Sequence, residues 1–133
     1  MKKLLGIFLI ISITTYVFAE ETYWANGNVR SIGSFKDGDK EGEWKYYNEN
    51  GELAAIGLYE DGDKEGEWKY YHKNGELAEI GLYDVDFKEG KWKIYNKDGQ
   101  FDRIEHWEDG ELIRTSHKIL HNKKIKVRKI NRN

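Results

Sequence analysis

Two segments of the chain carry carboxylates at the spacing of a calcium-binding loop. The text DGDKEG occupies residues 37–42 and returns at 61–66, which puts acidic side chains at loop positions one, three and five and glycine at position six. Such a loop needs a bidentate Glu at position twelve, where this chain has Asn48 and His72. The third copy, VDFKEG, lacks two of the carboxylates. A polar hairpin turn therefore accounts for these segments better than a calcium site.

Other residues with metal-binding or catalytic chemistry lack the partners that the chemistry requires. His117 and His121 are four residues apart, as two ligands on one helix face would be, but no third ligand accompanies them. A carboxylate pair for glycoside hydrolysis needs a cleft and one raised pKa, and a repeating meander offers no obvious concavity. The sequence contains no G-x-S-x-G elbow, HExxH motif or phosphate-binding loop. We expect no catalytic residues, no bound metal and no cofactor.

Aromatic residues recur more regularly than any other type with binding chemistry. Part of this set must form a core, because a sheet of these residues has little else to bury. The part that points outward would form a stripe that repeats every two strands, about 9.5 Å apart, and an exposed stripe of this kind marks a binding surface. The alternative is that all of them serve packing. The candidate binding residues are Trp44, Tyr46, Tyr47, Trp68, Tyr70, Tyr71, Trp92 and Tyr95.

The spacing of these aromatics comes from an internal repeat of 24 residues. The segment 41–64, EGEWKYYNENGELAAIGLYEDGDK, is identical at 17 of 24 positions to the segment 65–88 that follows it. A more divergent copy begins at Glu89, and another precedes residue 41. About four units result, two faithful inner ones between two looser outer ones, as expected when the end units cap a stacked array.

Each unit contains two strand-like segments separated by turn residues. EWKYYN is rich in aromatics and ELAAIGLYE in aliphatics, and Asn50-Gly51 between them predicts a two-residue type I′ turn. This turn places Tyr46 opposite Ala55 and Trp44 opposite Gly57, with the indole of Trp44 lying over that glycine. The expected fold is all-β, an elongated antiparallel β-meander of about four units with two strands each.

The N-terminal segment differs in character from the rest of the chain. Lys2 and Lys3 precede an apolar stretch that ends at a small-x-small site, Val17-Phe18-Ala19, which is the pattern of a secretory signal peptide cleaved before Glu20. We expect an exported protein of the periplasm, cell surface or extracellular space. The alternative is an uncleaved membrane anchor, although the apolar stretch is shorter than the roughly 20 residues of a spanning helix.

Charge separates the repeats from the C-terminal tail. All 24 acidic residues of the chain lie within residues 20–113, whereas residues 114–133 contain eight Lys and Arg and no acid. A basic tail after an acidic body can bind an anionic lipid surface or wall polymer, or can remain solvated beside the acidic body. Export makes nucleic acid an unexpected partner. The tail residues considered for binding are Lys118, Lys123, Lys124, Lys126, Arg128 and Lys129.

The repeats resemble those of the MORN-repeat-variant family. The matching segments are GEWKYYNENGEL, GEWKYYHKNGEL and GKWKIYNKDGQF, with a more divergent copy at TYWANGNV. The resemblance covers roughly residues 22–113. It implies an elongated antiparallel sheet without shared catalytic residues, and some bacterial members carry an antitoxin label. The same text also resembles the cell-wall-binding repeats that form aromatic cages. Here Lys45 and Lys69 follow the tryptophans, and a cation beside a cage argues against a quaternary ammonium ligand.

The sequence thus predicts three parts: a signal peptide at 1–19, a MORN-like repeat domain at 20–113 and a basic tail at 114–133. We expect a secreted, non-enzymatic interaction module whose partner is a protein or an anionic envelope surface. A glycan-binding protein of the cell wall is the first alternative. An antitoxin that neutralises a toxin by direct contact is the second, and the signal peptide argues against it.

Overall fold

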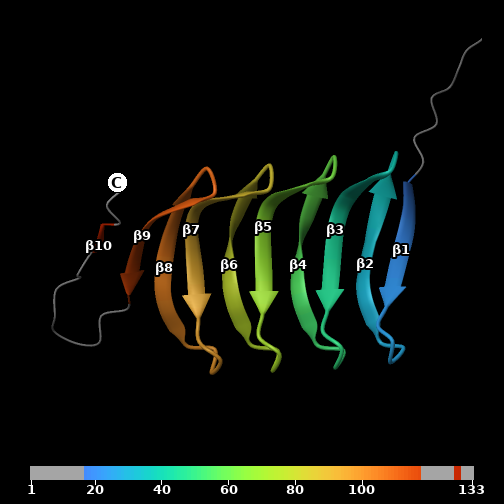
Figure 1. Cartoon of the computed structure of the whole chain (residues 1–133), viewed down its shortest axis with the longest axis horizontal. Helices are drawn as coiled ribbons and strands as arrows, with labels where there is room; N and C mark the ends of the chain where they lie inside the picture. The colour runs from blue at the N-terminus through green and yellow to red at the C-terminus, as the bar shows by residue number, and fades with distance from the viewer. Residues whose placement is uncertain (1–16, 118–127, 130–133) are drawn as a thin grey trace, which may run out of the picture.

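The computed structural model describes residues 17–117 and 128–129, and these residues form strands and turns (Figure 1). No helix long and apolar enough to cross a membrane occurs in this part of the chain. The strands are β1 (Val17–Tyr23), β2 (Val29–Lys36), β3 (Asp39–Tyr47), β4 (Leu53–Glu60), β5 (Asp63–Tyr71), β6 (Leu77–Asp84), β7 (Phe87–Tyr95), β8 (Phe101–Glu108), β9 (Glu111–His117) and β10 (Arg128–Lys129).

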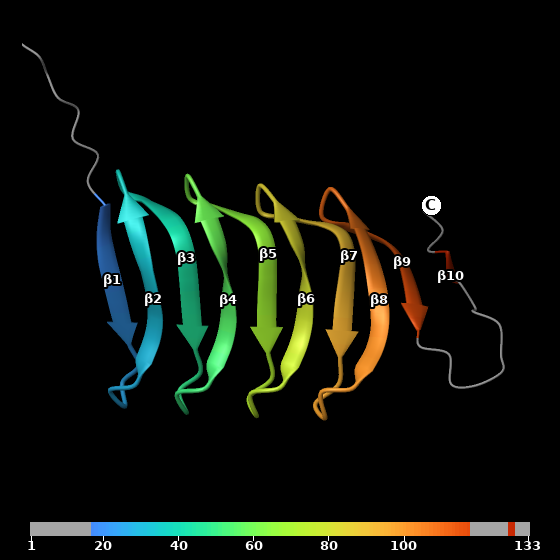
Figure 2. The same cartoon turned by 180° about the vertical axis from the view of Figure 1, so that it is seen from behind.

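The strands form one open antiparallel sheet in which spatial order equals sequence order, from β1 to β10. Figures 1 and 2 show strands β1 to β9 side by side in a single row, with β3, β5 and β7 clearly bent. Because every hairpin pairs only with its neighbours in sequence, the array is quasi-one-dimensional. The predicted all-β meander with two strands per unit is confirmed.

The turns inside the units differ from the predicted type. Gly51 N donates to Asn48 O at 2.9 Å and Asn48 N donates to Glu52 O at 2.8 Å. Only Gly51 of the Asn50-Gly51 pair has positive φ, at 85°. This is a three-residue loop that ends in a left-handed glycine, not a type I′ turn. The register shifts between Tyr46 and Tyr47, where Ala54 is the extra residue on β4 between the pairs Tyr46–Ala55 and Tyr47–Leu53.

The type I′ conformation occurs instead at the turns between units. Both central residues have positive φ at Asp37-Gly38, Asp61-Gly62 and Asp109-Gly110. The DGDKEG text therefore forms a hairpin turn and the start of the following strand, as the sequence favoured. Glu41 in the first copy accepts a hydrogen bond from Asp61 N at 3.1 Å, so one turn is held to the next.

Val85-Asp86 breaks this rule, because a β-branched residue occupies a left-handed position at φ 45°. We expect Val85→Asn to raise the free energy of unfolding by about 1 kcal/mol, since Asn tolerates this conformation. Asp61 holds the equivalent position at φ 47° one unit earlier, so Asp61→Val should lower it by a similar amount. Urea denaturation measures both changes. Effects of the same sign for the two substitutions would contradict this explanation.

The core lies on one face of the sheet and is built from one tryptophan per unit. Trp44, Trp68 and Trp92 are 2%, 1% and 0% exposed. The predicted partners Trp44–Gly57 and Tyr46–Ala55 are confirmed. We call the face that carries the three tryptophans the aromatic face and the opposite one the second face.

The glycine beneath each indole is not the one predicted. A Cβ on Gly33 would meet the Trp44 ring at 2.1 Å, and one on Gly57 would meet Trp68 at 2.2 Å. Each indole thus lies over the glycine of the preceding strand, whereas the prediction placed Trp44 over Gly57. The cause is a bulge: between the pairs Ile56–Lys69 and Leu58–Glu65, the following strand has additional residues that carry Trp68 across Gly57.

The sheet extends past the predicted domain limits at both ends. β1 includes Val17-Phe18-Ala19, and Phe18 stacks on Phe35 with ring centroids 5.4 Å apart. Cleavage before Glu20 would remove these three residues from the strand. At the other end, β9 continues to His117, and Arg128 and Lys129 of the tail pair with Thr115 and Arg114 as β10.

Candidate interaction surfaces

The aromatic face is a continuous ladder of ring contacts that runs across the strands. Trp68 illustrates its unit: it stacks with Tyr70 at 5.9 Å and contacts Tyr59 edge to face at 5.2 Å. Tyr83, on the second strand of the same hairpin, makes a further edge contact with Trp68 at 5.9 Å. The indole N–H of Trp68 donates to Leu58 O at 3.1 Å, which satisfies this buried donor. Trp44 makes the same kinds of contact with Tyr46, Phe35 and Tyr59, whereas Trp92 contacts Tyr83 edge to face and has Ile94 in place of the stacked tyrosine.

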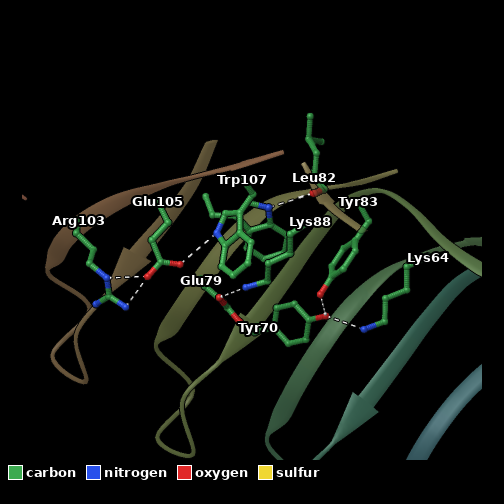
Figure 3. A network of polar contacts seen from close by, with 10 residues as sticks. Lys64, Tyr70, Glu79, Leu82, Tyr83, Lys88, Arg103, Glu105 and Trp107 are labelled. Atoms are coloured by element: carbon green, nitrogen blue, oxygen red, sulfur yellow. Dashed lines mark hydrogen bonds and ion pairs between the residues drawn. The ribbon is translucent and has the colours of Figure 1, made fainter. Parts of the chain in front are cut away.

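Each cluster of rings is filled by a lysine of the same chain. Lys64 Nζ lies 4.7 Å from the Trp68 ring centroid and 4.8 Å from that of Tyr83, and it donates to Tyr70 Oη at 3.0 Å (Figure 3). Lys40 and Lys88 hold the equivalent places, each over a tryptophan. The aromatic cages are therefore occupied by internal ammonium groups.

The tyrosine hydroxyls beside these lysines lie in a poorly solvated environment. Tyr46 and Tyr59 share a hydrogen bond of 3.1 Å. Burial, followed by that hydrogen bond, raises the pKa of Tyr59 to about 12. Burial is also the main cause that raises the pKa of Tyr70. These phenols stay protonated at neutral pH, where they serve as hydrogen-bonding partners of the lysines.

An ionic cap closes the aromatic face at its C-terminal end. Glu105 stands opposite Trp92, where the inner units have Gly57 and Gly81. Its carboxylate accepts hydrogen bonds from Arg103 Nε at 2.9 Å and from Trp107 Nε1 at 3.2 Å (Figure 3). No further tryptophan follows within β9, so a carboxylate fills the space that an indole would take.

The second face carries the remaining aromatic candidates and two exposed leucines. Side chains alternate along a strand, so Lys45 and Tyr47 lie opposite to Trp44 and Tyr46. Tyr47, Tyr71 and Tyr95 are each partly exposed, one per unit. Leu58 and Leu82 are 48% and 51% exposed at equivalent positions. The eight predicted residues are therefore divided between the two faces: Trp44, Tyr46, Trp68, Tyr70 and Trp92 line the aromatic face, and the three tyrosines line the second face.

Asparagine side chains link the turns at one edge of the sheet. Asn26, Asn50 and Asn74 donate through Nδ2 to the backbone carbonyls of Glu49, Lys73 and Lys97, each one unit further along. Open hollows lie between these turns, and the one lined by Trp24, Asn48, Glu49, Asn50 and Lys73 has a volume of about 500 Å³. The fourth turn has Asp98, whose side chain lacks this donor.

Most of the predicted tail residues lie outside the described residues. Lys118, Lys123, Lys124 and Lys126 belong to this group, as does His121, the second member of the proposed metal pair. Arg128 and Lys129 are placed by their backbone pairing with β9. The binding role of the tail stays a prediction.

The lysines that fill the cages were not among the residues predicted from the sequence. The prediction named Lys45 and Lys69, which lie beside the tryptophans in sequence but on the second face, where they pair with Glu43 and Glu67 at 3.0 and 3.1 Å. The relevant signal was the lysine four residues before each tryptophan, at 40, 64 and 88. The conclusion that a cation disfavours a quaternary ammonium ligand still applies, with different residues supplying the cation.

Three consecutive segments of the chain, residues 19–37, 40–61 and 64–84, match the family model of the MORN repeat variant. No curated protein matches the chain. The first matched segment begins within β1, the other segment ends lie close to the turns between units, and the fourth unit, with its capping Glu105, lies beyond them. A repeat of this family is in general a non-enzymatic binding module.

Proposed function

Residues 19–84 belong to the MORN repeat variant family, and on this premise we propose that the protein is an exported, non-enzymatic interaction module of the bacterial envelope. It uses the second face of its elongated sheet as the contact surface. Its partner is an envelope protein or an anionic envelope surface, and the basic tail contributes to the latter contact.

The observation that carries this proposal is the difference between the two faces. On the aromatic face, the tryptophans are buried and the cages contain Lys40, Lys64 and Lys88. On the second face, a tyrosine and a leucine recur at equivalent positions in successive units. Repeated exposed apolar side chains on one face of a sheet are typical of an interaction surface.

The filled cages also bear on the glycan-binding alternative. A quaternary ammonium group would have to displace an ammonium that already lies 4.0–4.7 Å from each indole ring. Binding of sugars or of a toxin at the second face is a possible outcome of the partner-capture experiment described below.

The first test is the N-terminus and location of the native protein. We expect mass spectrometry of fractionated source cells to find Glu20 at the N-terminus, outside the cytoplasm. An intact Met1 in the soluble cytoplasm would contradict the proposal and favour a search for a toxin partner.

The second test asks whether the second face of the sheet binds the partner. Leu58→Ser with Leu82→Ser should weaken capture of the partner from envelope extracts at least tenfold, because both side chains lie on the second face. Val85→Ser with Phe87→Ser is the matched control, since these side chains are 54% and 56% exposed but lie at the turn between β6 and β7 and at the first residue of β7. Equal losses in the two variants would argue against a specific face.

A further inference from the structure

The turns inside the four units lie in a row at one end of the strands (Figure 1), and two hollows open between them. Their volumes are about 500 and 480 Å³, within the range of small-ligand sites. We call them the first and the second hollow. Lys73 lines both, so one short linear ligand can reach the two. The other lining residues are Trp24, Asn48, Glu49 and Asn50 in the first hollow, and Tyr71, His72, Asn74 and Lys97 in the second.

Hydrogen bonds from one turn to the next hold the walls of the hollows in place. Trp24 Nε1 donates to Tyr47 O at 3.0 Å, and His72 Nε2 donates to Tyr95 O at 3.1 Å, since a carbonyl oxygen can only accept. The guanidinium carbon of Arg30 lies 5.0 Å from the centroid of the Trp24 ring, which holds this ring further. Walls that are already ordered lower the entropy cost of binding a ligand.

Asn48 has the place of Trp24 and His72 in the second turn, but it makes no such bond. Its Nδ2 is buried and has no hydrogen-bond partner among the residues that the structure describes. A buried donor without a partner destabilises a fold, so it calls for an explanation. Asn48 lines the first hollow, and a rotation of its amide toward the hollow would bring this donor to an acceptor on a bound ligand. The unpaired amide therefore indicates a ligand with hydrogen-bond acceptors.

The chemistry of the walls matches a sugar. Each hollow combines one aromatic residue, Trp24 or Tyr71, with amide and charged side chains, which suits a ligand with apolar ring faces and hydroxyl groups at its rim. An extended peptide would need free backbone groups, whereas turn amides are engaged within their own turns, as when Gly51 N donates to Asn48 O at 2.9 Å. Glu49 in the first hollow repels a chain of phosphates. An oligosaccharide meets all three conditions.

The charges of the two hollows differ. In the first, Glu49 accompanies Lys73, whereas the second has Lys73 and Lys97 and no carboxylate among its lining residues. Within the described part of the chain, neither lysine takes part in an ion pair. The carboxylates of Glu52 and Glu76 approach the glycines of the following turns and line neither hollow. The second hollow is therefore suited to the carboxylate of an acidic sugar.

We propose that the two hollows bind an oligosaccharide that lies along the turns. Asn48 donates to it in the first hollow, and Lys73 and Lys97 hold the carboxylate of an acidic sugar in the second. This inference goes beyond the proposed function, because the site requires neither the exposed leucines of the second face nor the basic tail.

The test uses protein made from the complete coding sequence and two probes of equal length. One is chitotetraose, which is uncharged, and the other is a tetrasaccharide of alternating N-acetylglucosamine and N-acetylmuramic acid. We expect calorimetry to find the acidic probe bound at least about fivefold more tightly. Lys97→Gln should remove this difference, whereas Lys45→Gln on the second face should leave it unchanged.

Asn48→Ala separates binding from folding. The removed donor has no partner in the described part of the free protein, so we expect about fivefold weaker binding of both probes with no loss of stability in urea denaturation. Asn96→Ala is the matched control at the equivalent position. Asn96 Oδ1 accepts from Asp98 N at 3.0 Å and from Gln100 N at 2.9 Å, and Asn96 lines neither hollow. This control should lose stability and keep its affinity for both probes.

Failure of both probes to bind at millimolar concentration would overturn the site. Equal affinities for the two probes would overturn the assignment of an acidic sugar, and a loss of stability in Asn48→Ala as large as that in Asn96→Ala would overturn the role of Asn48. The variant Leu58→Ser with Leu82→Ser should bind the acidic probe as the unchanged chain does, and loss of binding in it would overturn the placement of the site at the turns. None of these results depends on export or on capture of a partner, so the site and the proposed function can fail separately.

Discussion

Gly57→Ala is expected to lower the free energy of unfolding by about 3 kcal/mol, although it adds a single methyl group. The new Cβ would lie 2.2, 2.3 and 2.5 Å from Cδ2, Cε2 and Cγ of Trp68. The indole cannot yield easily, because Tyr46, Tyr59, Tyr70 and Tyr83 all contact it. Urea denaturation followed by near-ultraviolet circular dichroism measures both the loss of stability and the displaced indole.

Gly66→Ala is the control that separates crowding from backbone strain. Gly66 has φ of +66°, and a methyl group added to it would have no atom within 4 Å, whereas Gly57 has ordinary backbone and no space. The expected loss at Gly66 is about 1 kcal/mol, the penalty for a left-handed alanine. If Gly57→Ala were no more destabilising than Gly66→Ala, the indole would not be the reason for the recurring glycine. Replacing Trp68 by Leu in the Gly57→Ala chain should recover part of the loss.

The repeat made the fold predictable, but it did not predict which tryptophan covers which glycine. A period of 24 residues with one Trp and one Asn-Gly or Asp-Gly per unit is sufficient to indicate paired strands and their approximate register. It does not show how many residues a bulge contains. The bulge at Gly66 decided that Trp68, not Trp44, covers Gly57. The sequence similarly marked Asn50-Gly51 as a turn, but the conformation depended on whether Asn50 also took positive φ.

The sequence identified the aromatic residues of the candidate site, but it did not show which of them lie on which face of the sheet. The aromatic stripe was expected to divide between faces, and the alternation of Tyr46 and Tyr47 shows how. The lysine cages depend on contacts between Lys64 and rings of two paired strands, and only Trp68 and Tyr70 are near it in sequence. Lys91, His106 and Arg114 likewise lie side by side only because of the register of three strands. Long-range contacts of this kind carry no local sequence signal.

Glu105→Ala is expected to lower the free energy of unfolding by about 2–3 kcal/mol. The change leaves Trp107 Nε1 without its acceptor and removes the Arg103 ion pair of 2.8 Å. Removing one member of a fully buried pair costs about 3–5 kcal/mol, and the expected loss is smaller here because the Arg103 side chain is 32% exposed. Asp102→Ala, which removes the more exposed partner of Arg103, should cost less than about 1 kcal/mol.

Glu105→Gly tests whether the cap needs the carboxylate of Glu105 or only the residue type that the inner units have at this place. Glycine is the residue of the inner units at this place, so a purely local preference of the repeat would make the change harmless. In the inner units, however, the glycine makes room for the tryptophan of the next hairpin, and β9 supplies none over Glu105. Glu105→Gly should therefore be at least as destabilising as Glu105→Ala in urea denaturation, since it adds backbone freedom to the lost contacts. If Glu105→Gly left the free energy of unfolding unchanged, the aromatic face would need no cap. The double variant Arg103→Ala with Glu105→Ala tests the pair itself. If it loses less stability than the sum of the two single variants, Arg103 and Glu105 act together as the element that closes the aromatic face.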